Sequence, residues 1–101
     1  MDLNFTPKDV KEMERTVGQS IDEIVTTPTM ANLSLLLRKG LNLNVDQTDE
    51  LLGDKLKELG KDELMFAIME VLQEQGFLSA LITPQNVREQ MKKYAQKIND
   101  L

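Results

Sequence analysis

Four side chains between positions 44 and 50 have the spacing of the first ligands of a calcium-binding loop: Asn44, Asp46, Thr48 and Glu50. Such a loop needs glycine at its sixth position and, at its twelfth, a glutamate that gives both oxygens to the ion. This chain has Asp49 and Lys55 at those positions. We therefore interpret the four side chains as helix caps and solvated surface, and we expect no metal site.

A phosphate-binding loop is the second pattern that fails. Gly60-Lys61 matches the end of that loop, but the next residue must carry a hydroxyl and is Asp62, and Lys55 takes the place of the first glycine. A metal-dependent enzyme that uses the carboxylates of residues 46–50 is kept as an alternative. It would require tight metal uptake that stabilises the fold.

Histidine and cysteine are absent from the chain. Ser-His-Asp and Cys-His nucleophilic sites, His-Cys zinc sites, thiol redox chemistry and disulfides all need those side chains. Acid–base catalysis would depend on carboxylates, lysines or the single tyrosine, Tyr94, each with a strongly shifted pKa near pH 7. We therefore predict that the chain is not an enzyme and binds no cofactor.

The composition is typical of one small helical domain. The chain has 101 residues, 41% of them apolar, with 5 Gly and 3 Pro, which fits a single globular core. With 6 Met, no Trp and 4% aromatics, aliphatic side chains must fill that core, and this favours helix packing. No segment approaches the roughly 20 apolar residues of a membrane span, and the N-terminus lacks a signal peptide, so we expect a soluble intracellular chain.

Start and stop signals divide the chain into about six helices. Thr-Pro pairs and a Ser-x-x-Glu capping box mark starts, and glycines mark ends. The predicted helices run from Pro7 to Gly18, from Ile21 to Val25, from Thr27-Pro28 to Gly40, from a cap at Asp46 or Thr48 to Gly60, from Asp62 to Gly76, and from Thr83-Pro84 onward. Gly53, inside the fourth helix, indicates close approach by a neighbouring helix. Leu3 and Phe5 fit a short extended arm or an edge strand.

The last two predicted helices differ in their apolar pattern. The segment from Leu64 to Leu72 is apolar almost all round, so this helix should lie at the centre of the domain or reach a partner surface. The final helix has a narrow apolar stripe on a basic background, formed by Val87, Met91, Tyr94, Ala95 and Ile98. We therefore predict an all-α fold, a single compact domain of about six helices with a short extended N-terminal arm and an amphipathic basic C-terminal helix.

The charge distribution sets the last helix apart. The net charge of -5 divides into 8 bases and 15 acids over residues 1–83 and 4 bases and 2 acids over residues 84–101, or -7 and +2. We predict that residues 1–82 form the helical domain and that residues 83–101 form a helix docked on that domain or on a partner. An overall acidic chain argues against nucleic acid as the main partner.

The apolar content of the C-terminal third predicts a binding function. A domain of this size has a large surface relative to its volume, and apolar side chains in excess of a core mark contacts with another chain. Methionine is more often a core residue, but it also lets a surface accept varied apolar partners. The predicted partner-binding residues are Met65, Phe66, Met69, Leu72, Phe77, Leu78, Met91 and Tyr94.

Residues 3–78 follow, in order and spacing, a series of segments found in one protein family. Leu3-Asn4-Phe5-Thr6 leads into Val10-Lys11-Glu12-Met13-Glu14 and then Val17-Gly18-Gln19-Ser20-Ile21. A leucine-rich helix follows at Leu33-Ser34-Leu35-Leu36-Leu37-Arg38-Lys39-Gly40-Leu41, and the last matching segments are residues 45–52 and 64–72. The chain thereby resembles the tail assembly chaperones of long-tailed, non-contractile bacteriophages and gene transfer agents. It departs from their pattern at residues 41–44 and in the basic helix after Thr83.

The resemblance implies a non-virion assembly factor in the cytoplasm of an infected bacterium. Such a chaperone self-associates and coats the long, helical tape measure protein, keeping it soluble until tail tube subunits polymerise around it. Many family members also exist in a longer, frameshifted form that recruits the tail tube protein. Neither nucleic acid nor a membrane is an expected partner. The alternative is a small helical DNA-binding or regulatory adaptor protein that uses the basic helix from Arg88 to Lys97.

Overall fold

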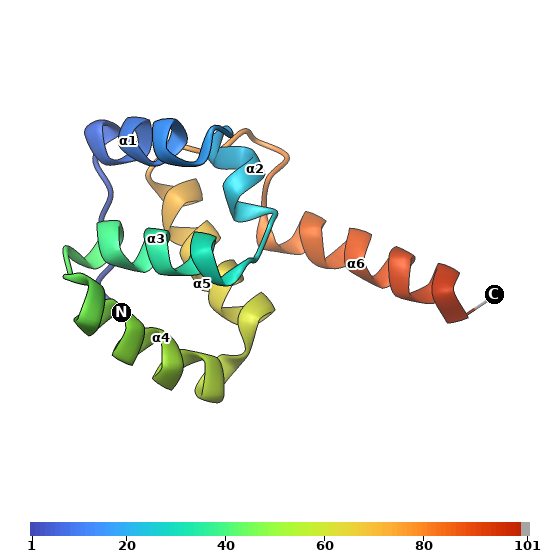
Figure 1. Ribbon diagram of the computed structural model, residues 1–101. Coiled ribbons are helices and arrows are strands. Elements are labelled where there is room, and N and C mark those ends of the chain that lie inside the picture. The colour runs from blue at the N-terminus through green and yellow to red at the C-terminus, as the bar shows by residue number, and fades with distance from the viewer. Residues whose placement is uncertain (100–101) are drawn as a thin grey trace.

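Six α-helices and no strand make up residues 1–99, which the computed structural model describes (Figure 1). The helices are α1 Pro7–Val17, α2 Ile21–Val25, α3 Met30–Leu41, α4 Val45–Leu59, α5 Lys61–Glu74 and α6 Pro84–Asn99. The predicted all-α domain of about six helices is therefore confirmed. Residues 100–101, part of the predicted C-terminal segment 83–101, lie outside the described residues.

Capping side chains set the starts of the first two helices where the sequence predicts them. The Thr6 hydroxyl accepts from the Asp9 amide, and the Ser20 hydroxyl accepts from the Glu23 amide, each with the reciprocal carboxylate bond of a capping box. Gly18 ends α1 with a φ of 77°, a left-handed conformation that glycine adopts without strain.

Two predicted helix starts are wrong by two to four residues, because other polar side chains provide the caps. The predicted cap of α4 was Asp46 or Thr48, but Asn44 accepts from the Gln47 amide at 2.8 Å, and Thr48 is buried one turn later. The third helix begins after Thr29 instead of Thr27. Each of these asparagine and threonine oxygens satisfies an amide that the first helical turn leaves without a partner.

The predicted stop at Gly40 is wrong, because α3 continues through it to Leu41. Asn42, with a φ of 54°, adopts the left-handed conformation that ends the helix. Gly40 is instead where the extended N-terminal arm crosses α3. The Asn4 amide donates to the Gly40 carbonyl at 2.9 Å, and a Cβ on Gly40 would lie 2.5 Å from Leu3 Cδ2 and 2.7 Å from Phe5 Cζ.

The arm also reaches the end of α5. The Phe5 amide donates to Gln75 Oε1 at 3.0 Å, and Gln75 Nε2 donates to Asn4 Oδ1 at 2.7 Å. Phe5 is 3% exposed. The arm therefore joins α3 to the C-terminal end of α5 through one backbone bond to Gly40, two bonds to the Gln75 side chain and the buried Phe5 ring.

Helix α5 is the centre of the fold, as its apolar pattern predicts. It packs on α2, α3, α4 and α6. Its fully buried side chains are Leu64, Ile68, Met69 and Leu72. Because other helices cover α5 on several sides, most of its circumference can be apolar.

Helix α6 projects from the body formed by the other five helices (Figure 1). Of those five helices, it packs chiefly on α5, and its C-terminal half extends into solvent. The amphipathic C-terminal helix is thus present, with much of its apolar stripe left uncovered by its own chain.

None of the helices in residues 1–99 is long and apolar enough to span a membrane.

Candidate functional site

The eight predicted partner-binding residues fall into three groups by burial. Met65, Phe66, Met69 and Leu72 belong to the core and are at most 6% exposed. Phe77 and Leu78 are partly buried against that core. Two of the eight are exposed on the folded chain: Met91, 41% exposed, and Tyr94, 69% exposed.

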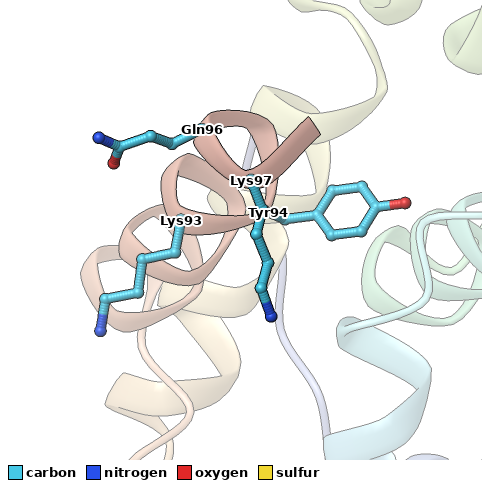
Figure 2. A pocket seen from close by; sticks show the side chains of 4 residues that line it. All are labelled: Lys93, Tyr94, Gln96 and Lys97. Carbon is cyan, nitrogen blue, oxygen red and sulfur yellow. The ribbon is translucent and has the colours of Figure 1, made fainter. Parts of the chain in front are cut away.

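Both exposed residues belong to one apolar row on α6, which we call the α6 stripe: Val87, Met91, Tyr94, Ala95 and Ile98. These positions recur every three or four residues, so they share one helix face. Val87 packs against the core, whereas Ile98 at the far end is 50% exposed. Figure 2 shows Tyr94 pointing to one side of α6 while Lys93 and Gln96 point away from it.

A hollow of about 170 Å³ lies where the stripe meets the body. We call it the junction groove, and its lining residues are Val25, Thr26, Pro28, Asp62, Met65, Phe66, Val87 and Met91. Shallower hollows continue from it along both sides of α6. Met91 lines all three hollows, so the groove and the stripe form one continuous apolar surface. One wall of the groove comes from the body and the other from α6.

An ion pair fixes the first half of α6 on α5. Arg88 Nη1 lies 2.6 Å from Glu63 Oε1, and Arg88 Nη2 lies 2.8 Å from Glu63 Oε2. The guanidinium also lies 4.3 Å from the centre of the Phe66 ring. The hydrogen bond from Arg88 lowers the pKa of the Glu63 carboxyl, and the same bond raises the pKa of Arg88.

The connector before α6 is held by side chains as well. The Ser79 amide donates to Asp22 Oδ1 at 3.0 Å, and the Ser79 hydroxyl donates to Asp22 Oδ2. Asn86 Nδ2 donates to the Leu81 carbonyl at 2.9 Å. Together with the Arg88 pair, these bonds give α6 a defined direction away from the body. Because α6 does not fold back onto the body, the stripe is exposed to solvent.

Cations border the stripe. Helix α6 contains Arg88, Lys92, Lys93 and Lys97 and a single acid, Glu89. At 100° per residue, Lys92 and Lys97 fall on opposite borders of the stripe, while Glu89 falls on the face opposite to it. Arg88 is already paired with Glu63. The two lysines are exposed, so the apolar surface along the outer half of α6 lies between positive charges.

Two side chains of the calcium-like pattern, Asn44 and Thr48, have structural roles. Asn44 caps α4, and the Thr48 hydroxyl donates to the Asn44 carbonyl at 2.7 Å. Across the described part of the chain, no group of three or more acidic, histidine or cysteine side chains is arranged to hold a metal ion.

Sequence reasoning missed the body wall of the junction groove. Val25, Pro28 and Asp62 line it, although none of them was predicted to bind a partner. No local pattern in the sequence pairs these residues with the final helix, because their proximity depends on the packing of α2 and α6 on α5. Ile98 was placed on the stripe but omitted from the predicted contacts, and it is 50% exposed.

Comparisons with protein-family models, with curated proteins and with solved structures find no match to this chain.

Proposed function

We propose that this chain is a phage tail assembly chaperone that self-associates and coats the tape measure protein, binding it through the α6 stripe and the junction groove. The observation that carries the proposal is the exposure of Tyr94 and Ile98 on a helix that projects from the body. A projecting amphipathic helix with an uncovered stripe offers a second helix the contacts of a two-helix pair. The order of segments in the sequence supplies the family resemblance.

The chemistry of the surface suits a client with many imperfect sites. Met91 lies at the meeting point of the groove and the stripe, and an unbranched thioether side chain adapts to partners of different shape. Neither histidine nor cysteine is present for catalysis. We therefore propose binding, and not catalysis, as the function of this chain.

The small size of the surface suits binding that must be reversed. Full burial of a side chain the size of leucine or phenylalanine contributes about 1.5–3 kcal/mol, and ordering of the partners offsets part of it. One copy of the chain can thus bind a client segment only weakly through Met91, Tyr94 and Ile98. Many copies on one client bind more strongly together because of their effective concentration. Each single copy can still be displaced when tube subunits polymerise.

The cellular setting belongs to the same proposal. The chaperone would act in the cytoplasm of the infected bacterium and would be absent from the finished virion. A longer frameshifted product would recruit the tail tube protein.

Co-expression tests the proposal. The tape measure protein is produced alone, with this chain, with Tyr94→Asp and with Val45→Asp. We expect the native chain to keep the client in the soluble fraction and to co-purify with it, and Tyr94→Asp to lose both effects. Val45 is 60% exposed at the start of α4 and lines neither the groove nor the stripe hollows, so Val45→Asp is the matched control and should retain both. A client that is equally soluble and unbound in all four cultures would refute the proposal.

A further inference from the structure

The α6 stripe has a charge pattern that restricts what can lie on it. Lys92 and Lys97 border its outer half on opposite sides, whereas Asp62 of α5 lines the junction groove at its inner end. Asp62 forms no ion pair with any of the described residues. Asp62 also lines the hollow that contains Lys92, so acidic charge on a partner is favoured along the outer half of the stripe, between Lys92 and Lys97.

We infer that the α6 stripe and the junction groove together bind an amphipathic helix whose apolar face is bordered on both sides by acidic side chains. Those acids would face Lys92 and Lys97. The inference rests on the proposed function and names the chemistry of the client segment.

The charge complementarity is specific to this face of α6. The one acid of the helix within the described residues, Glu89, lies opposite the stripe, and Arg88 is neutralised by Glu63. A second copy of α6 would bring a basic helix against a basic border, which is repulsive. An acid-bordered partner helix is therefore favoured over a second copy of this chain.

Two synthetic peptides of about 18 residues, enough to span α6, test the inference. Both have leucines at helical spacing, both are held helical by a covalent staple, and both have the same composition. One has glutamates on both borders of its leucine face and lysines on the opposite face, and the other has these glutamates and lysines exchanged. Their dissociation constants are measured by fluorescence anisotropy with the full native chain, in salt from about 50 mM to about 300 mM.

We expect the first peptide to bind about tenfold more tightly than the second at low salt, and the difference to shrink as salt rises. Lys92→Glu with Lys97→Glu should reverse the preference, and Tyr94→Asp should weaken both peptides. The matched control for charge is Lys8→Glu with Lys11→Glu, two exposed lysines of α1, which should keep the preference. Circular dichroism of each variant verifies that α6 is still helical.

Three results would overturn the inference: equal binding of the two peptides, tighter binding of the second, or a preference that survives the change at Lys92 and Lys97. Self-association of the chain that Tyr94→Asp abolishes would show that a second copy covers the stripe. Direct binding of duplex DNA that is equally tight to the native chain and to Tyr94→Asp would assign the basic helix to nucleic acid instead. If neither peptide binds but the tape measure protein still co-purifies with the chain, this inference alone is refuted. If the first peptide binds as expected but the tape measure protein does not co-purify, the proposed function alone is refuted.

Discussion

Arg88 of α6 and Glu63 of α5 form a two-pronged ion pair beside the junction groove, with nitrogen–oxygen distances of 2.6 and 2.8 Å. Parallel bonds of this kind fix orientation as well as distance. The pair lies near the base of the projecting helix α6, where a change in the angle between α6 and α5 would displace the outer end of the stripe. The pair therefore contributes more to the direction of α6 than to global stability, since both side chains are about half exposed.

The first prediction concerns pH. The pKa of Glu63 is lowered from its ordinary value of 4.5, so the folded state favours the ionised form, and the stabilisation is fully present above that value and is lost as pH falls through the lowered pKa. We expect the native chain to melt at a slightly higher temperature than Glu63→Gln near neutral pH and the difference to vanish in acid. Thermal melts of both chains across this pH range measure it.

The control for that melt series is Glu50→Gln on α4. Glu50 is exposed and belongs to no ion pair of the described residues. Its difference from the native chain should stay small and change little with pH. A difference for Glu63→Gln that persists unchanged into acid would show that the pair does not stabilise the fold.

The second prediction is that alanine has opposite effects at Gly40 and Gly53. A Cβ at Gly40 would meet Leu3 Cδ2 and Phe5 Cζ, and the Phe5 ring is buried and its amide is bonded to Gln75. Leu3 can rotate away, but Phe5 cannot. Overpacking costs about 1–3 kcal/mol and exceeds the gain of about 1 kcal/mol from the better helix propensity of alanine. We expect Gly40→Ala to lower the free energy of unfolding by about 1 kcal/mol.

Gly53 is the internal comparison. Nothing lies within 4 Å of a Cβ placed there, so Gly53→Ala should raise the free energy of unfolding by about 0.5–1 kcal/mol through helix propensity alone. Urea unfolding of both variants measures the two signs. Equal effects at the two positions would mean that the arm does not pack on Gly40.

These two glycines also show how far the sequence could predict the fold. The helices, most of their caps and the central α5 followed from local spacing, because capping and amphipathic burial depend on neighbouring residues. The sequence predicted Gly40 as a helix stop and Gly53 as a close approach, and both predictions are wrong. What distinguishes them is the position of Leu3 and Phe5, which come from a segment about 35 residues away in sequence, and local pattern contains no information on that contact.

The same limit applies to the candidate site. The α6 stripe and its basic borders could be read from helical spacing, and Met91 and Tyr94 were predicted as contacts. The junction groove could not, because Val25 and Asp62 become neighbours of Met91 only through the packing of α2 and α6 on α5. The apolar pattern of α5 is equally compatible with a core and a partner surface, and burial at Met69 and Leu72 assigns both to the core.

The third prediction separates the core from the exposed surface by two substitutions to the same residue. Met69 is fully buried and Tyr94 is 69% exposed. Met69→Asp places a charge in the core without a partner, which is strongly destabilising, and we expect loss of the cooperative melt. Tyr94→Asp should leave the circular dichroism spectrum and the melting temperature nearly unchanged. A large fall in melting temperature for Tyr94→Asp would mean that Tyr94 packs on its own chain in solution.

The fourth prediction concerns stoichiometry. A protein that coats its client must bind in a number that grows with client length, whereas a cap on one end binds in a fixed number. Helix α6 has 16 residues and is about 24 Å long, so a helical client fragment of about 60 residues, about 90 Å long, has room for about four copies along one side. Light scattering of complexes with tape measure fragments of about 60 and about 120 residues should show the number of bound copies doubling with length. The same small number of copies on both fragments would rule out coating and would leave only binding at a single site.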